Sequence, residues 1–209
     1  GEEVRKSFLK EYSVQVIPNG IDRTCFCPLE SDLRSRLGLQ DKFVVLGVAN
    51  VWERRKGLEY FVELSRRLSE AFQIILIGLS QKQIRELPDN VIGLERTSSV
   101  EELAQYYSMA DVFVNATLED NFPTTNLEAL SCGTPVITYE TGGSPESLDE
   151  SCGRVVQKRD VDALVRAILD EKAHPKKRED CLKRAEQYEK YDRFQEYVEL
   201  YHRLIGQGE

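Results

Sequence analysis

Short runs of consecutive apolar residues alternate along this chain with segments of helical periodicity, and this alternation constrains the fold more than any other feature. The runs are VQVIP (14–18), FVVLGVA (43–49), FQIILIG (72–78), VIGLE (91–95), DVFVNA (111–116), TPVIT (134–138) and GRVV (153–156). Apolar runs without polar alternation are typical of strands covered on both faces. Strands that alternate with helices are joined by right-handed crossovers, so the pattern predicts an α/β fold with a doubly wound parallel sheet.

The helical segments fill the stretches between these runs, and from Val161 onward the pattern is helical to the end of the chain. The 209 residues are enough for one sizeable core. We therefore predict one α/β domain over residues 1–175, followed by C-terminal helices over residues 176–209.

Charge and composition narrow the classes of partner. The net charge of −8 argues against duplex nucleic acid or anionic lipid as the main partner, because both require clustered cations. No apolar run approaches the 18 residues or so of a transmembrane helix. Five cysteines without a repeated CxxC spacing indicate buried thiols in a reducing compartment. We expect a cytoplasmic protein, with the inner face of the membrane as the alternative location for the full-length chain.

Ligands of doubly wound sheets bind beyond the carboxyl ends of the strands, so the turns at that edge matter most. The turn after the run at 43–49 carries Arg54, Arg55 and Lys56 directly before a helical segment. Cations at a helix start are favourable when an anion joins them, so this triplet is a candidate diphosphate site. The alternative is a solvated run of charge. Gly57 would allow a ligand to approach the backbone closely.

The turn after the run at 111–116 reads DNFPTT and leads into the helical segment NLEALSC. We expect Thr124 or Thr125 to cap this helix and leave free amide groups that face the crevice. Glu128 follows Thr125 by three residues, a spacing that fits a capping box as well as it fits a ligand contact.

Other turns have ordinary explanations when taken alone. Gly142 and Gly143 mark a tight turn, and no GxGxxG or GxxxxGK[ST] fingerprint is found anywhere in the chain. Asp160 and Asp162 form an Asp-x-Asp pair. Metal-dependent sugar transferases use a pair of this kind to hold a divalent cation. Because the pair opens a helical segment, we favour helix capping for it, and we expect no metal.

Taken together and in this order, the motifs resemble the donor-binding C-terminal domain of GT-B glycosyltransferases of family 4, a Rossmann-like half of a two-domain enzyme. VIPNGID (16–22) is similar to the start of that domain, and RRKGLEYF (54–61) to its Lys-Gly phosphate turn. ADVFVNATLEDNFPTTNLEALSCGTPVI (110–137) is similar to its acid-x7-acid signature, and TGGSPE (141–146) to the Gly-rich turn that follows.

The resemblance implies a role for each matching position. Lys56, with Arg54 and Arg55, would bind the donor diphosphate, together with the backbone amides of Thr124, Thr125 and Asn126. Glu128 would accept hydrogen bonds from the ribose hydroxyls. The sugar would meet Asp120, Asn121 and Phe122, and the base would meet the backbone near Ile92 and Leu94. The expected catalytic set is Lys56, Asp120 and Glu128, which would stabilise charge on the departing diphosphate.

Two positions depart from the family pattern. Asp120 stands where the first acid is usually Glu, which shortens that side chain by one methylene. Val51 stands five residues before Lys56, where the family commonly has Arg. Arg54 or Arg55 would have to supply that charge from another direction, and Asn50 would contribute a weaker hydrogen bond.

The resemblance further implies transfer of a hexose-type sugar to an acceptor hydroxyl with retention, in a setting such as polysaccharide biosynthesis. It places the acceptor on a separate N-terminal domain in cis, so we expect these residues alone to bind the nucleotide-sugar donor without transferring sugar. Two alternatives remain: a GT-B sugar-nucleotide epimerase, and a non-catalytic sugar-nucleotide-binding module. An epimerase would need further acids and His near the sugar, whereas His174 and His202 both lie in the helical C-terminal part.

The last helical segment carries an apolar stripe. Phe194, Tyr197, Tyr201 and Leu204 fall on one face at helical spacing. Packing against the domain's own core is the default expectation for such a stripe. The resemblance suggests instead that part of it faces the N-terminal domain.

Overall fold

Six parallel strands form the centre of the molecule in the computed structural model, which describes residues 2–206. The strands are β1 (Phe43–Val48), β2 (Phe72–Ile77), β3 (Val91–Leu94), β4 (Val112–Asn115), β5 (Val136–Tyr139) and β6 (Gly153–Val156). Their order in the sheet is β3-β2-β1-β4-β5-β6, and every pairing is parallel. The predicted doubly wound α/β fold is confirmed.

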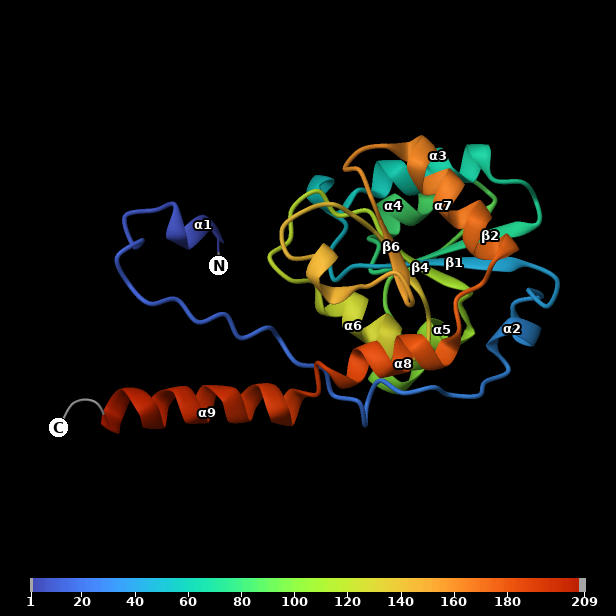
Figure 1. Cartoon of the computed structure of the whole chain (residues 1–209). Helices are drawn as coiled ribbons and strands as arrows, with labels where there is room; N and C mark the ends of the chain where they lie inside the picture. The colour runs from blue at the N-terminus through green and yellow to red at the C-terminus, as the bar shows by residue number, and fades with distance from the viewer. Residues whose placement is uncertain (1, 207–209) are drawn as a thin grey trace.

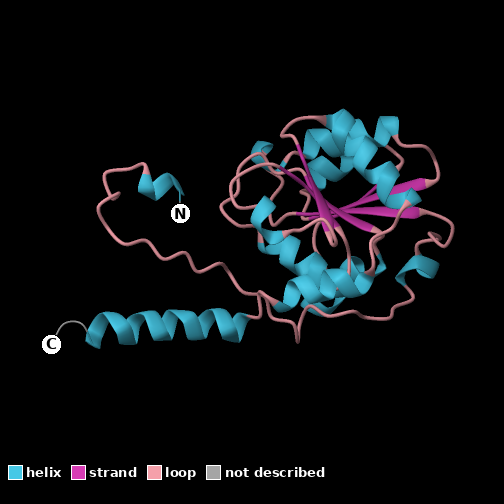
Figure 2. Cartoon of the chain, in the orientation of Figure 1, coloured by secondary structure: helices cyan, strands magenta, loops and turns pink. Residues whose placement is uncertain are grey.

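Helices cover both faces of this sheet (Figures 1 and 2). The helices of the described residues, of which α1 and α9 do not cover the sheet, are α1 (Glu2–Arg5), α2 (Leu33–Arg36), α3 (Leu58–Arg67), α4 (Gln81–Glu86), α5 (Val100–Met109), α6 (Thr124–Ser131), α7 (Val161–Ala173), α8 (Arg178–Glu186) and α9 (Lys190–Gly206), with the 3-10 turns η1 (Arg54–Lys56) and η2 (Pro145–Ser147). Buried side chains of α3 and α7 pack on one face, and those of α5, α6 and α8 pack on the other.

The alternation of side chains between the two faces of each strand explains these two layers of helices. Within β1, Val44 and Leu46 belong to the core under α5 and α6, whereas Val45 belongs to the core under α3 and α7. Since successive residues of a strand point to opposite faces, a strand buried on both sides must be apolar at every position. The uninterrupted apolar runs of the sequence follow from this requirement.

The strand predicted at residues 14–18 is wrong. These residues are extended but unpaired, and the first bridge along the segment joins Ile21 to Glu189. An apolar run becomes a strand only where a neighbouring edge offers hydrogen bonds, and this segment runs beside α9 instead. The Tyr197 hydroxyl donates to Ile17 O at 3.5 Å, and Arg203 donates to the side chain of Gln15.

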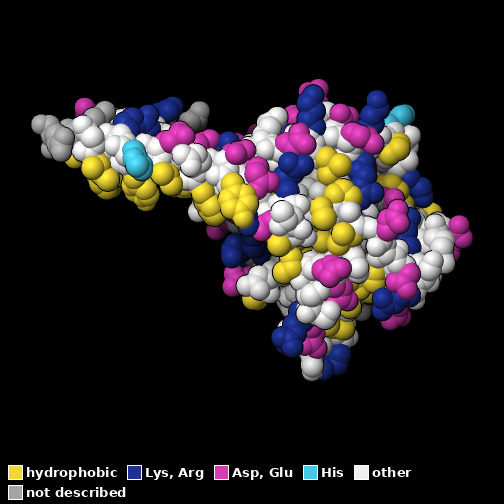
Figure 3. Space-filling model, turned by 90° about the horizontal axis from the view of Figure 1, so that it is seen from below, with side chains coloured by type: hydrophobic (Ala, Val, Ile, Leu, Met, Phe, Trp, Pro, Cys, Tyr) yellow, Lys and Arg dark blue, Asp and Glu magenta, His cyan; other side chains and the backbone are white. Residues whose placement is uncertain are grey.

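Helix α9 projects from the domain together with residues 2–20 (Figure 1). None of its described side chains is buried, and its apolar stripe lies open along one face (Figure 3). Phe194, Tyr197, Tyr201 and Leu204 are 40–61% exposed. The default expectation that this stripe packs into the domain's own core is therefore wrong. Among residues 2–206, no helix is both long and apolar enough to cross a bilayer.

Candidate functional site

A cavity of about 380 Å³ opens at the carboxyl edge of the sheet, between the loop after β1 and the loop after β4. The chain passes outward from β1 through β2 to β3 and then returns to place β4 on the other side of β1. The cavity therefore lies at the topological switch point, where ligands of doubly wound sheets bind. A larger cavity of about 630 Å³ lies at the opposite edge, near the start of β1 and β4. We take the smaller one as the candidate site because of its place in the fold.

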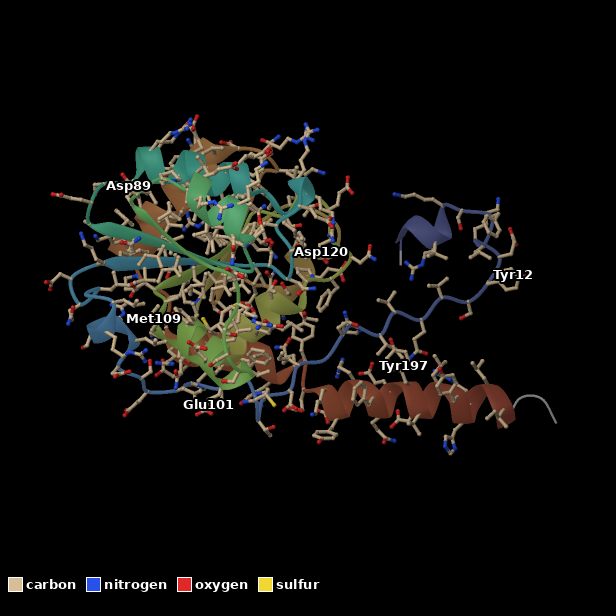
Figure 4. All side chains as sticks on the ribbon, turned by 180° about the vertical axis from the view of Figure 1, so that it is seen from behind. Tyr12, Asp89, Glu101, Met109, Asp120 and Tyr197 are labelled. Atoms are coloured by element: carbon tan, nitrogen blue, oxygen red, sulfur yellow. The ribbon has the colours of Figure 1, made fainter. Side chains whose placement is uncertain are left out.

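Lys56 and Asp120 meet inside the cavity at the switch point. The Lys56 ammonium donates to Asp120 Oδ2 at 2.8 Å, and the two side chains are 22% and 18% exposed. The contact is set by the backbone below it, because the amide of Leu118 donates to Arg55 O at 2.7 Å and ties the two loops together. Asp120 lies at the end of the domain from which α9 and residues 2–20 project (Figure 4).

The three basic residues of η1 take different directions. Lys56 and Arg55 line the cavity, whereas Arg54 lines a separate groove between α3 and α4. Arg55 pairs with Glu53 at 3.1 Å and also lies 3.5 Å from Glu119 O. The structure thus brings Arg55, and not Arg54, to the side of the cavity that is also lined by Val51.

Gly57 links this turn to α3 in a left-handed conformation, with φ at 76°. A Cβ at this position would lie 2.3 Å from Ala116 O. The glycine therefore permits a close approach of the β4 loop to η1 in addition to its unusual φ. This approach is what holds Lys56 beside Asp120.

Helix α6 begins differently from the prediction. Pro123 occupies the N-cap without a side-chain hydrogen bond, and Thr124 and Thr125 are the first two helical residues. The predicted threonine cap is therefore wrong, and the capping box for Glu128 is not formed. Proline is tolerated here because its fixed φ suits a helix start and it has no N–H group that would need an acceptor. The first amides of α6 have no intrahelical acceptor, and Thr124 and Thr125 line the cavity.

Glu128 lies one turn further along α6 and faces α5. The hydroxyl of Tyr107, a fully buried residue of α5, donates to Glu128 Oε2 at 2.8 Å. Burial raises the pKa of Glu128, while hydrogen bonds from Tyr107 and Thr124 oppose that rise. No sequence pattern singles out Tyr107, because a tyrosine in a helical pattern is indistinguishable from other core residues.

Asn126 has its side chain turned into the protein. Its Oδ1 accepts from Asn115 at 2.8 Å, and its Nδ2 donates to Ser147 Oγ at 3.0 Å. Ser147 in turn donates to Ser144 O at 2.7 Å. This buried chain joins the end of β4, the start of α6 and η2. The amide of Asn126 donates to Pro123 O at 3.3 Å, so both its side chain and its amide have protein partners.

The predicted tight turn at Gly142 and Gly143 is confirmed, and it supports the candidate site from behind. Gly142 has a φ of 48°. A Cβ on Gly142 would lie 1.7 Å from Asp120 O, and one on Gly143 would lie 2.1 Å from Asn121 O. Only glycine permits this contact, which fixes the backbone that carries Asp120.

The remaining expected contacts are spread around this centre. Phe122 lines the cavity, and Asn121 is exposed beside it. Ile92 and Leu94 lie on β3, which is separated from β4 by the two strands β2 and β1, and they do not line the cavity. Leu94 O accepts from the amides of Gly78 and Leu79.

The predicted helix cap is confirmed for Asp160, and Asp162 lies in the first turn of the same helix. Asp160 accepts from the Ala163 amide at 2.8 Å at the start of α7, and Asp162 pairs with Arg67. Within residues 2–206, no group of three or more His, Cys, Asp or Glu side chains is placed to hold a metal ion.

Comparison with models of protein families identifies the family of this chain. The family model described as glycosyl transferases group 1 matches residues 42–171, which include Lys56, the whole acid-x7-acid stretch and the Gly-Gly turn. The chain belongs to this family. Its domain corresponds to the C-terminal half of a GT-B glycosyltransferase, as the sequence motifs suggested.

Curated members of the glycosyl transferases group 1 family are similar to this chain over part of their length. A GDP-mannose-dependent alpha-(1-6)-phosphatidylinositol monomannoside mannosyltransferase of Mycolicibacterium smegmatis is 31% identical over 186 residues, which cover 79% of this chain and 48% of that protein. An alpha-galactosylglucosyldiacylglycerol synthase of Streptococcus pneumoniae is 30% identical over 65% of this chain and 40% of that protein. The chain spans about half the length of such relatives or less.

Solved structures of other proteins share this fold. Sucrose-phosphate synthase of Thermosynechococcus elongatus superposes with a TM-score of 0.85 at 26% identity, covering 99% of this chain and 56% of that one. Anabaena HepE in complex with UDP-glucose superposes with a TM-score of 0.78 at 21% identity, covering 90% of this chain and 57% of that one. The second likeness supports the fold alone.

Proposed function

We propose that this chain binds the nucleotide diphosphate sugar of a glycosyltransferase and presents it for transfer of a hexose-type sugar to an acceptor hydroxyl. One observation supports this proposal above all others: Lys56 and the first amides of α6 converge on a single cavity at the switch point of the sheet. A cation and a helix N-terminus together form a site for a phosphate group.

In the proposed reaction, negative charge grows on the departing diphosphate as the sugar–phosphate bond breaks. The Lys56 ammonium and the amides of Thr124 and Thr125 are fixed in place before the reaction, so they stabilise this charge most strongly in the transition state. We assign to them the role that a divalent cation has in metal-dependent transferases. Addition of EDTA should therefore leave donor binding unchanged.

The donor's base and sugar stay open. The mycobacterial relative is named for GDP-mannose and the Anabaena protein was solved with UDP-glucose. The backbone of Ile92 and Leu94, which lie on β3 outside the cavity lining, is our candidate for the base contact. Because backbone contacts do not depend on the amino-acid type, the side chains at these positions do not identify the base.

We propose that the acceptor binds to another domain of the full-length protein, across the crevice from Lys56. The stripe of α9 is exposed, and α9 projects from the end of the domain that carries Asp120 (Figure 4), which supports this arrangement. Residues 1–209 would then bind donor without transferring sugar. Transfer with retention is part of the same proposal, and the anomeric configuration of the full-length enzyme's product tests it.

The proposed binding is measured by calorimetry with UDP-glucose, GDP-mannose and ADP-glucose. A charged contact contributes about 1.5–3 kcal/mol and a helix N-terminus up to about 2 kcal/mol, so a Kd on the order of 10 µM to 1 mM is expected for at least one donor. Absence of binding by all three at millimolar concentration would refute the proposal. The epimerase alternative gains no support, since neither His174 nor His202 lines the cavity.

Tyr107→Phe tests the proposed ribose contact of Glu128. Loss of the Tyr107 hydroxyl removes the hydrogen bond that fixes Oε2, so the carboxylate is less well placed for the ribose. We expect binding of UDP or GDP to weaken by roughly 3- to 10-fold, within the value of one hydrogen bond to a charged group, and binding of the 2′-deoxy nucleotide to change little.

Tyr106→Phe is the matched control, because it removes the hydroxyl of the adjacent buried tyrosine on α5. This variant should discriminate ribose from deoxyribose as the wild type does. An equal loss of affinity for both sugars in Tyr107→Phe would show that Tyr107 supports folding and not the orientation of Glu128.

A further inference from the structure

The charged side chains that line the Lys56 cavity form two ion pairs, so their positive and negative charges cancel. Lys56 pairs with Asp120, and Arg55 pairs with Glu53 at 3.1 Å. These four line the same cavity. A diphosphate that enters this site therefore meets two cations that carboxylates of the protein already neutralise, which is an unexpected arrangement for a site that binds a strong anion.

The pair between Lys56 and Asp120 differs from an ordinary surface ion pair. Its two side chains are mostly buried, so solvent and salt screen it less than they screen an exposed pair. Its backbone is also fixed, because Gly142 packs directly against Asp120 O. The Asp120 carboxylate can rotate away from Lys56, but its main chain cannot retreat from the cavity.

We propose that Asp120 is an internal anion that occupies Lys56 until a donor diphosphate displaces it, and that this makes the site favour nucleotide sugars over free nucleoside diphosphates. The inference rests on the proposed function. It goes beyond that function by assigning to Asp120 a selection between substrate and product.

The selection follows from charge. A free nucleoside diphosphate carries a terminal phosphate that can hold one more negative charge than the diester of a nucleotide sugar. Once displaced from Lys56, the Asp120 carboxylate stays within a few ångströms of the bound phosphates, and like charges at that distance repel. The hydroxyls of a bound sugar can donate hydrogen bonds to the displaced carboxylate, whereas a free nucleoside diphosphate lacks these sugar hydroxyls. Release of the spent nucleotide is thereby favoured.

Asp120→Asn tests this inference, because it removes the charge and keeps the shape of the side chain. Calorimetry measures the Kd of two probe pairs, UDP with UDP-glucose and GDP with GDP-mannose. We expect the variant to bind the free diphosphate about tenfold more tightly than the wild type does, and the matching nucleotide sugar to gain less. The ratio of the two Kd values should therefore shift toward the free diphosphate.

Glu119→Gln is the control, since it removes the same charge from the neighbouring, exposed residue and should leave both Kd values unchanged. Asp120→Ala should reproduce the tighter binding of the free diphosphate if Asp120→Asn folds poorly. Unchanged or weaker binding of the diphosphate by the Asp120 variants, with wild-type binding intact, would overturn the inference alone. Absence of binding of either pair by the wild type and both variants would overturn the proposed function with it.

Discussion

Replacing Asn126 by alanine is expected to lower the free energy of unfolding by about 2–4 kcal/mol. The change removes two hydrogen bonds and leaves the Asn115 amide donor buried without its partner, which costs about 1–3 kcal/mol, and it also opens a small cavity. For a domain of this size the loss corresponds to a fall in Tm of roughly 4–16 °C. Urea denaturation followed by circular dichroism measures it.

Asn121→Ala is the matched control for this substitution. Asn121 is exposed in the loop that precedes α6, and surface changes of this kind usually lie within about 0.5 kcal/mol of the wild type. If the two variants were equally stable, the buried chain from Asn115 to Ser147 would not be what holds the start of α6 in place.

Lys56→Ala is expected to weaken nucleotide binding by roughly 10- to 150-fold, the equivalent of about 1.5–3 kcal/mol for one hydrogen bond to a charged group. The substitution removes the cation and also leaves Asp120 unpaired beside the phosphates, and both effects act in the same direction. Calorimetry with the donors that bind the wild type measures the change, and thermal unfolding verifies that the variant is folded.

Arg54→Ala supplies a control of equal charge within the same 3-10 turn. Arg54 lines the groove between α3 and α4 and not the Lys56 cavity. We expect its removal to change affinity less than threefold, through the long-range loss of one exposed positive charge. Equal losses in both variants would mean that the net charge of η1, and not the position of Lys56, governs binding.

The sheet was predictable because its strands are buried on both faces and leave an uninterrupted apolar pattern. The same rule failed at residues 14–18, where an apolar run has no strand edge beside it and lies along α9. Whether such a run pairs depends on residues far away in the chain, and the pattern alone contains no such information.

The candidate site was predictable in its main parts, since Lys56, Asp120 and the Gly-Gly turn all belong to motifs at the carboxyl edge. Their local details were not. The contact of Tyr107 with Glu128 joins two helices, and the inward turn of Asn126 depends on partners on β4 and η2. Spacing along one helix carries no signal of either contact.

The open stripe on α9 shows a further boundary of sequence reasoning. Its helical spacing predicted an amphipathic helix correctly, and 17 residues form it. Periodicity shows which face is apolar but not what covers that face. Here the N-terminal segment lies beside α9 but leaves the side chains of the stripe 40–61% exposed.

The central claim is that a nucleotide binds where the loops after β1 and β4 meet, and an NMR titration of amide shifts tests it most directly. On addition of UDP or GDP, we expect the largest changes at Lys56, Asp120, Thr124 and Thr125, with α9 unaffected. Changes concentrated instead around Arg34, Met109 and Asp111, which line the larger cavity at the opposite edge of the sheet, would contradict the account.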